Sequence, residues 1–316
     1  MRVSMPFRLV RWRSNMNLLS ELIRTAPLIH REPGFGTVVS RLRYCLRGLV
    51  FAKATREWFE VFRDPRLAFI VFTHPGILEK MHRPYLTRSL RQRAALAALK
   101  QHYLLFVKSQ FSDALIETVY RHQGMIIATL ELEDVGRFLL RLSYQGRFHK
   151  EGELTVSLVD EERHCPIHFI TFCVASFTAD HRGLLIGGIQ GGKHPGDKER
   201  IVAITRAMHG LRPKALVVFA VQELARQWRI NSVRAVSDEL HVYRHRRYGR
   251  FVRARYNELW TECGGQIAAD GMFDLPVLPE ERDLTDLKAS KRQMYRRRHA
   301  MLRRLGEEIR AKLSAQ

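Results

Sequence analysis

The sequence lacks the cysteine pairs that build zinc ribbons and thioredoxin-type redox sites. Its four cysteines are widely separated, at Cys45, Cys165, Cys173 and Cys263. No CxxC spacing occurs, and no HExxH or paired Cys/His spacing accompanies them. Metal chelation by such motifs needs ligands at fixed short intervals. We therefore expect no metal site, and the isolated cysteines are typical of a reducing compartment.

Long apolar runs are also missing. A membrane-spanning helix needs about 18 or more apolar residues in a row, and the most apolar run, around Leu216 to Val221, is far shorter. The N-terminus MRVSMPFRLVRWRSNMNLL is basic but has neither an uninterrupted apolar region nor a small-residue cleavage site. We expect no transmembrane segment and a cytoplasmic location, with peripheral association at the inner membrane as an open alternative.

Acidic residues are scarce relative to basic ones. Lysine and arginine number 53 against 32 aspartates and glutamates, which gives a formal net charge of +21 and a pI of about 10.5. Such a balance favours polyanionic partners, namely nucleic acid, anionic lipid or lipopolysaccharide, or a phosphate-rich cofactor. A charge that only aids solubility is the alternative. Since 46% of the residues are hydrophobic, the chain has ample material for a folded core.

The hydrophobic period divides the chain into three parts. Residues 1–124 have helical spacing, with a long helix predicted over about 37–62 and further helices over 88–120. Residues 125–277 form a mixed core, with predicted strands at 126–132, 137–144, 153–160, 166–177, 184–189, 232–236 and 267–275 and helices at 197–209, 213–229 and 251–263. Residues 278–316 predict a basic helical tail. The sequence therefore predicts an α/β (α+β) fold.

A strand, a glycine cluster and a very apolar helix follow one another after residue 184. Glycines let backbone N–H groups approach a pyrophosphate, and the next helix N-terminus can meet an anion. This order looks like the acyl-CoA site of the GNAT acyltransferase fold, where a splayed strand receives the pantetheine arm, although the R/Q-x-x-G-x-G/A loop is absent. A structural glycine turn with a bulged strand is the alternative. The predicted cofactor-binding residues are Gly188, Gln190, Gly191, Gly192 and Lys193.

Acid/base groups gather in VSDELHVYRHRRYGR, residues 236–250, just beyond a predicted strand end. Ligands and catalytic groups tend to lie at that place in open α/β sheets. A carboxylate or histidine there could deprotonate an amine, and a tyrosine could protonate a leaving thiolate. The catalytic candidates are Glu239, His241 and Tyr243, and a solvated charged loop is the alternative.

Arginines cluster in two places. Guanidinium groups bind phosphates in a bidentate manner, so both clusters predict polyanion binding. The alternative is a solvated basic helix packed by its apolar stripe. A helix-turn-helix echo at 224–240 has the wrong turn residue and spacing, so we expect a strand there instead. The predicted polyanion-binding residues are Arg244, Arg246, Arg247, Arg250, Arg296, Arg297 and Arg298.

Several motifs taken together resemble the VirK/YbjX family of Gram-negative bacteria. They are GGIQGG (187–192), MHGLRPKALVVFAVQELARQW (208–228), VSDELHVYR (236–244), YNELWTECGG (256–265), FDLP (273–276) and KRQMYRRRHAMLRRL (291–305). The resemblance implies a role in virulence, envelope stress and antimicrobial-peptide resistance. It implies no catalytic residues, because the family has no agreed activity.

Together these observations predict two classes of function. The first is acyl-CoA-dependent acyl transfer on a GNAT-like mixed sheet, in an envelope and stress-adaptation role. The second is a non-enzymatic protein that binds nucleic acid or anionic lipid through its basic segments. An enzyme needs an enclosed site near residues 187–192, whereas a binder needs an exposed basic face and salt-dependent affinity.

Overall fold

The fold is that of a computed structural model, which describes residues 17–121, 124–176, 182–192, 197–244, 255–278, 283–285 and 287–315. The chain divides into two compact units, residues 1–83 and 84–316. The predicted division at residue 124 marks the change from helices to strands, while the second unit takes in the helices before that point as well. Each unit is described by itself below.

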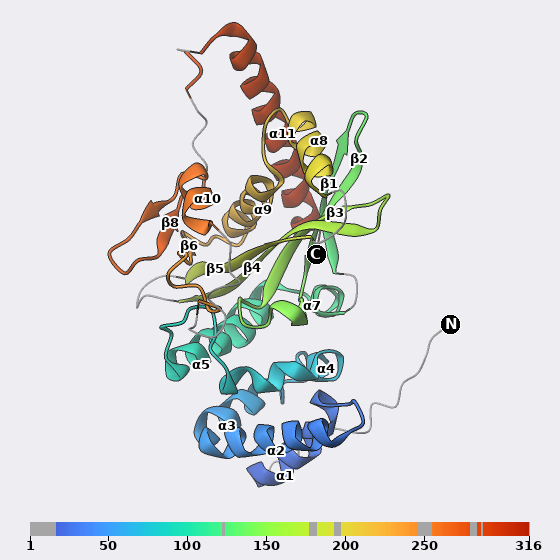
Figure 1. The fold of residues 1–316 in the computed structure, drawn as a ribbon, viewed down its shortest axis with the longest axis vertical. Helices are drawn as coiled ribbons and strands as arrows, with labels where there is room; N and C mark the ends of the chain where they lie inside the picture. The colour runs from blue at the N-terminus through green and yellow to red at the C-terminus, as the bar shows by residue number, and fades with distance from the viewer. Residues whose placement is uncertain are drawn as a thin grey trace. The chain divides into compact units, whose positions relative to one another are not determined.

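The first unit is helical (Figure 1). Asn17 caps its first helix by accepting a hydrogen bond from the Leu19 N–H at 3.3 Å. The helix predicted over 37–62 is two helices, because the backbone leaves helical geometry at Phe51. Trp58 is fully buried, and its Nε1 donates to the Ile77 carbonyl at 2.9 Å. The elements are α1 (Leu18–Ile29), α2 (Phe35–Val50), α3 (Ala52–Val61), α4 (Ala68–Thr73) and the 3₁₀ helix η1 (Pro75–His82).

The second unit begins with helices that precede the sheet. Ser112 caps one of them by accepting a hydrogen bond from the Leu115 N–H at 3.2 Å. Another segment has π-helical rather than α-helical hydrogen bonding, and this rare geometry recurs at functional sites. The elements are α5 (Gln92–Lys100), the π-helix η2 (Gln101–Val107), α6 (Lys108–Gln110) and α7 (Asp113–Tyr120).

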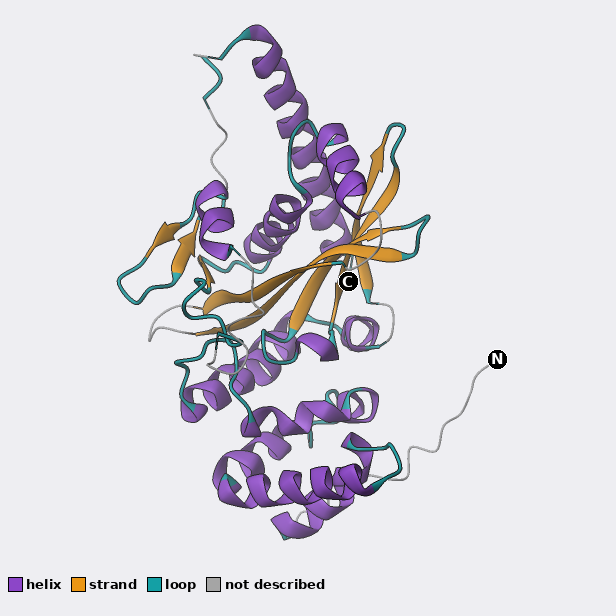
Figure 2. Cartoon of the chain, viewed as in Figure 1, coloured by secondary structure: helices purple, strands orange, loops and turns teal. Residues whose placement is uncertain are grey.

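An eight-stranded mixed sheet forms the centre of the second unit (Figure 2). The strand order is β1-β2-β3-β4-β5-β6-β8-β7, and β5 with β6 is the parallel pair among antiparallel neighbours. The strand predicted over 267–275 is two short strands joined by a turn. The strands are β1 (Met125–Leu132), β2 (Gly136–Ser143), β3 (Leu154–Asp160), β4 (Cys165–Ser176), β5 (Arg182–Gly191), β6 (Ser232–Ala235), β7 (Gln266–Ile267) and β8 (Phe273–Leu275). A 3₁₀ turn, η3 (Gly146–Phe148), lies between β2 and β3.

Helices cover both faces of this sheet. The apolar helix α9 (Pro213–Gln227) lies on one face, and α5 with η2 lies on the other (Figure 1). This arrangement confirms the prediction of a central strand that is apolar on both sides, since the middle of β4 is buried throughout. Pro213 occupies the first turn of α9, where a missing N–H costs little. The remaining helices are α8 (Asp197–Ala207), α10 (Tyr256–Glu262) and α11 (Ala289–Ser314).

The basic tail is the helix α11, which packs by its C-terminal half. Leu305, Gly306 and Ile309 are buried, and Glu308 accepts a hydrogen bond from the Thr129 N–H of β1 at 3.1 Å. Among the residues that the structure describes, no helix combines the length and the apolar character that crossing a bilayer would require. The mixed sheet with helices on both faces and the basic helix α11 confirm the predicted mixed α/β fold with a basic C-terminal helix.

Candidate functional site

The sheet opens along β5. Strand β5 pairs with β6 only up to Ile186 opposite Ala235, and the last contact is the Val236 N–H donating to the Ile186 carbonyl at 3.0 Å. Strand β5 itself continues to Gly191. At the same place a β-bulge interrupts its pairing with β4, because Thr171 faces Gly188 while Phe172 faces Ile186. Bulges of this kind re-aim side chains and are frequent beside active sites.

The two glycines at the bulge make room for a buried carboxylate. A side chain at Gly187 would overlap the backbone carbonyl of Glu151, and a Cβ at Gly188 would lie 2.6 Å from the Glu151 carboxyl group. Side chains alternate along a strand, so Gly188 and Gln190 share a face. Gly188 therefore leaves the space that Glu151 fills, and Gln190 supplies a donor to it. Glycine within a strand often marks such a close approach.

Glu151 is the centre of a buried acid/base cluster, with 0% exposure for its own side chain and 1% for His241. Its Oε1 accepts a hydrogen bond from Gln190 Nε2 at 2.9 Å and lies 3.3 Å from His241 Nε2. The other oxygen, Oε2, is buried and has no hydrogen-bond partner among the described residues. An unsatisfied buried acceptor is costly. This oxygen is accordingly the atom in the cluster best suited to receive a proton or a donor from a ligand.

The hydrogen bonds assign the histidine tautomer. His241 Nδ1 lies 3.4 Å from the Tyr243 backbone N–H, which can only donate. Nδ1 is then the acceptor, and the ring proton lies on Nε2, facing Glu151 Oε1 and the Tyr256 hydroxyl at 3.4 Å. Glu151 therefore orients His241 in the way that a carboxylate orients the histidine of a catalytic triad.

Tyr256 closes the cluster from the far side. Its hydroxyl donates to the Ile189 carbonyl at 3.1 Å, on the edge of β5 that β6 has left. The Tyr256 backbone N–H donates to Asp238 Oδ1 at 2.9 Å, so Asp238 fixes the start of α10. Burial raises the pKa of Tyr256, and the nearby Glu151 charge adds to this effect. The hydroxyl therefore stays protonated at neutral pH and remains a donor.

The segment Tyr85–Arg88 ties the parts of the cluster together. The Leu86 N–H donates to the Lys150 carbonyl at 2.7 Å, and the Arg88 N–H donates to the Leu240 carbonyl at 3.0 Å. The residues that precede Glu151 and His241 are therefore both hydrogen-bonded to the segment Tyr85–Arg88. Leu86 is fully buried with φ 58°, a left-handed conformation that costs roughly 1–2 kcal/mol for a residue with a side chain. Surrounding contacts must over-determine this geometry.

A second buried carboxylate lies two residues further along. Glu153 Oε1 accepts from the Tyr85 hydroxyl at 2.7 Å, and Oε2 accepts from the Tyr103 hydroxyl of η2 at 2.6 Å. Burial, followed by the Glu153 charge, raises the pKa of Tyr103 well above its usual range. Next to it, His102 Nδ1 accepts from the Val174 N–H at 3.2 Å. Both oxygens of Glu153 are therefore satisfied by donors that stay protonated.

Two of the three predicted catalytic residues lie at the buried cluster, and the third lies outside it. His241 lies in the buried cluster, and Tyr243 lies beside it, with ring centroids 5.7 Å apart and Lys150 Nζ 4.9 Å from the Tyr243 ring. Glu239 is exposed instead, and its Oε2 accepts from Asn257 Nδ2 at 3.5 Å. Hydrogen bonding from its own backbone lowers the pKa of Glu239. It does not join the cluster around Glu151.

The predicted cofactor-binding residues follow the open edge of β5. Gly188 is buried, Gln190 is half-buried and Gly191 is exposed, so the edge becomes accessible towards its end. The Gly192 N–H donates to the Ile167 carbonyl at 2.8 Å, which extends the pairing with β4. Lys193 lies outside the described residues.

The predicted polyanion-binding residues have different surroundings. Arg244, Arg296 and Arg297 are exposed, and Arg246, Arg247 and Arg250 lie outside the described residues. Arg298 is a structural anchor, because its Nε and Nη2 donate to the His209 carbonyl at 3.1 and 2.6 Å. It attaches α11 to the turn between α8 and α9.

Sequence reasoning missed Glu151 and Tyr256. The charged string HKEGE around Glu151 is typical of a solvated loop, and Tyr256 lies thirteen residues from Tyr243, the nearest of the catalytic candidates in the chain. A signal for Glu151 was present in the paired glycines inside a predicted strand, which indicate that something approaches the backbone closely. Nothing in the sequence identified which residue approaches.

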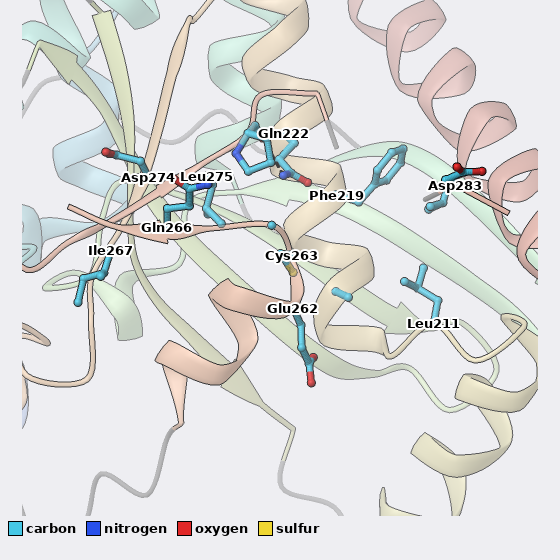
Figure 3. Close-up of a pocket in the computed structure, with 14 residues that line it drawn as sticks. Leu211, Phe219, Gln222, Glu262, Cys263, Gln266, Ile267, Asp274, Leu275 and Asp283 are labelled. Atoms are coloured by element: carbon cyan, nitrogen blue, oxygen red, sulfur yellow. Dashed lines mark hydrogen bonds between the residues drawn. The ribbon is translucent and has the colours of Figure 1, made fainter. Parts of the chain in front are cut away.

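A separate cavity of about 900 Å³ lies between α9, α10 with β7, and α11. Figure 3 shows Phe219 and Gln222 of α9 lining it opposite Cys263 and Gln266. Burial raises the pKa of the Cys263 thiol to about 12. Since the thiolate is the reactive form, this cysteine is not an activated nucleophile. In the part of the chain that the structure describes, no three His, Cys, Asp or Glu side chains gather in a way that could hold a metal ion.

Comparisons with known proteins support one family. Residues 34–311 match a family described as "Protein of unknown function (DUF535)". The chain is 32% identical over 267 residues to the "Uncharacterized protein YbjX" of Escherichia coli (strain K12), covering 83% of this chain and 80% of that protein. It is also 28% identical over 186 residues to an "Uncharacterized protein" of Haemophilus influenzae, covering 57% of this chain and 59% of that protein. No solved structure matches the chain. The match over most of its length, together with the likeness to YbjX, shows that the chain belongs to the DUF535 family, which confirms the resemblance to YbjX-type proteins.

Proposed function

We propose that this chain is an acyl-CoA-dependent acyltransferase. The thioester of the bound acyl-CoA would lie along the edge of β5 that β6 has left. The observation that carries the proposal is the parting of β5 from β6 beyond Ile186, at a bulge, with Glu151, His241 and Tyr256 along the edge that β6 has left. Uncovered backbone groups of a strand can pair with the amides of a pantetheine arm, as in the GNAT fold. In open α/β sheets, ligands also tend to bind beyond the carboxyl ends of the strands.

The cluster contains the groups that acyl transfer to an amine requires. The amine nitrogen attacks the thioester carbonyl, the C–S bond breaks, and the products are an amide and free CoA. Glu151 takes the amine proton on Oε2, the oxygen without a partner, while His241 holds the carboxylate in place. Tyr256 gives its hydroxyl proton to the departing sulfur, and the raised pKa of Tyr256 keeps that proton available until then.

Binding tests the first half of the proposal. Purified protein is titrated with acetyl-CoA, longer acyl-CoAs and free CoA at two salt concentrations, with thermal unfolding as the readout. Ligand at about 100 times its Kd adds about 2.7 kcal/mol of stability, which raises the Tm by several degrees. We expect saturation that survives moderate salt and depends on the acyl chain. No stabilisation, or one that salt abolishes, contradicts an acyl-CoA site.

Turnover tests the second half. Thiol release from the acyl-CoA that binds best is measured with a panel of primary amines, using Glu151→Gln and, as its control, Glu131→Gln on the exposed face of β1. General-base catalysis contributes about 10²–10⁴-fold, so Glu151→Gln should lose at least a hundredfold in rate and keep its acyl-CoA binding. Equal rates for the two variants would remove Glu151 from the mechanism.

The resemblance to VirK/YbjX proteins supports a physiological setting for this activity in envelope and stress adaptation, including virulence and antimicrobial-peptide resistance. A deletion strain complemented with wild type or Glu151→Gln tests this setting. We expect the wild type alone to restore survival in a cationic antimicrobial peptide. Equal rescue by both would separate the phenotype from the chemistry.

A second candidate, non-enzymatic polyanion binding, rests on α11. This helix exposes Arg296, Arg297 and Arg304, while it packs through Leu305 and Ile309. Binding of this kind weakens steeply with salt, because counterions are released on association. The salt arm of the titration therefore separates the two candidates.

A further inference from the structure

Helix α2 of the first unit exposes an apolar face, which a helix in a folded core would normally bury. Its apolar residues lie outward, with 84% exposure for Phe35, 59% for Leu42 and 53% for Leu46. They recur at intervals of three and four, which places them on one side of a helix. The complete stripe is Phe35, Val38, Leu42, Leu46, Leu49 and Val50, all exposed. Apolar stripes of this length usually mark an interaction surface.

The opposite face of α2 makes the intramolecular contacts. Tyr44 is buried, and its hydroxyl is 2.9 Å from Thr25 Oγ1 of α1. Gly48, one turn later, lets Leu22 approach so closely that a Cβ there would be 2.5 Å from the leucine side chain. The helix is therefore fixed in the unit through a small residue and a tyrosine. The apolar stripe on the other face of α2 takes no part in this packing and stays exposed.

The charges beside the stripe indicate what covers it. Helix α2 contains three arginines and no acidic residue. Arg41 caps α1 by donating from Nε and Nη2 to the His30 carbonyl at 3.1 and 2.7 Å, whereas Arg43 and Arg47 are exposed. By its position in the helix, Arg43 borders the apolar stripe, and Arg47 follows it one turn later on the same side. An apolar face with basic residues along its border is the pattern of helices that lie in the headgroup region of an anionic bilayer.

We propose that α2 docks this protein on anionic membrane surfaces, with the stripe in the acyl boundary and Arg43 and Arg47 among the lipid phosphates. The 16 residues of α2 span about 24 Å at 1.5 Å per residue, long enough to lie along a bilayer. A twofold contact with a second copy fits less well, because the net charge of +21 on each copy opposes it. This surface is independent of the site on β5.

The test is flotation of the full chain with vesicles of phosphatidylcholine alone or with 30% phosphatidylglycerol. The wild type should partition onto the anionic vesicles about tenfold more strongly than onto neutral ones. The variant Leu42→Ser/Leu46→Ser/Leu49→Ser should lose about tenfold or more of this partitioning, and Arg43→Gln/Arg47→Gln should lose several-fold. The matched controls are Val202→Ser/Leu278→Ser, exposed apolar residues elsewhere, and Arg91→Gln/Arg93→Gln, exposed arginines at the start of α5. Both should bind as the wild type does, and circular dichroism checks that every variant is folded.

Three results would overturn the proposal. Unchanged partitioning of the triple serine variant would remove α2 from membrane binding. A wild-type dimer in sedimentation that the same variant abolishes, without vesicle binding by either, would assign the stripe to a second copy. Vesicle binding that appears only after deletion of residues 1–16 would assign it to the chain's own N-terminal segment. Glu151→Gln should float like the wild type, so failure of the acyltransferase proposal leaves this one standing.

Discussion

Glu151 and Glu153 are two residues apart and equally buried, yet their surroundings differ in one respect. Both oxygens of Glu153 accept hydrogen bonds from tyrosines, at 2.7 and 2.6 Å. Glu151 has partners on one oxygen only, and the other has none among the described residues. A fully satisfied buried carboxylate holds a structure together, whereas a half-satisfied one costs stability. The difference separates a carboxylate with a structural role from one to which we assign a proposed chemical role.

The largest expected loss of stability comes from removing Glu153, the carboxylate whose two oxygens both have donors. Glu153→Ala leaves the hydroxyls of Tyr85 and Tyr103 buried without their acceptor, so the free energy of unfolding should fall by about 3–5 kcal/mol. Urea unfolding followed by circular dichroism measures this loss. Glu131→Ala, which removes an exposed carboxylate on β1, should change it by less than about 0.5 kcal/mol. A loss below about 1 kcal/mol for Glu153→Ala would mean that Glu153 is not structural.

Crowding the unsatisfied carboxylate should cost less. Gly188→Ala puts a Cβ 2.6 Å from the Glu151 carboxyl group, and overpacking of this kind costs about 1–3 kcal/mol. Gly191→Ala is the matched control, because the nearest atom to its Cβ would be His168 Nε2 at 3.9 Å. Thermal unfolding of both variants separates the two effects. Equal stability would show that Glu151 moves aside without cost.

The tyrosines of the two clusters offer a finer comparison. Tyr103→Phe leaves Glu153 Oε2 without its donor and should cost about 1–3 kcal/mol, because the acceptor is charged. Tyr256→Phe removes a donor from the neutral Ile189 carbonyl and should cost about 1 kcal/mol. Denaturant midpoints at equal m-values give the difference. The reverse order would indicate that Glu151, rather than Glu153, depends on its tyrosine.

Glu151→Gln should have the smallest effect on stability, within about 1 kcal/mol of the wild type. The glutamine oxygen still accepts from Gln190, and a buried charge with an unpaired oxygen is removed. The proposed acyl transfer should nevertheless be lost. A strong loss of stability would place Glu151 with Glu153 as a structural residue.

Much of the fold could be predicted because period and burial are local signals. The strand β3, the doubly buried β4 and the Pro213 start of α9 are all visible in the sequence. The apolar/polar alternation in β3 predicts a half-buried strand, whereas all seven of its residues are buried. The break between α2 and α3 at Phe51 could not be predicted, because the apolar spacing of the sequence continues across it. The π-turn of η2 was also invisible, because its hydrogen bonding leaves no distinct residue pattern.

The candidate site could be predicted only in part. His241 was found because it follows a strand in the chain, and the glycines of β5 were found because they cluster around the end of a predicted strand. Glu151 and Tyr256 were missed because their approach depends on contacts between distant segments, namely the space at Gly188 and the anchor that Asp238 gives to α10. Glu239 was chosen because carboxylates near strand ends are good candidates, and its exposed side chain is turned to Asn257 instead.

The π-turn of η2 has a consequence for how this family can change over time. A π-turn holds one residue more than the α-turn that it replaces. Deleting any one residue of Gln101–Val107 would restore a regular helix and rotate the two ends against each other by roughly 100°. His102 and Tyr103 would then lose their places against Val174 and Glu153. Relatives that keep this glutamate and tyrosine should therefore show no single-residue gap here when their sequences are aligned, and a gap should coincide with the loss of both.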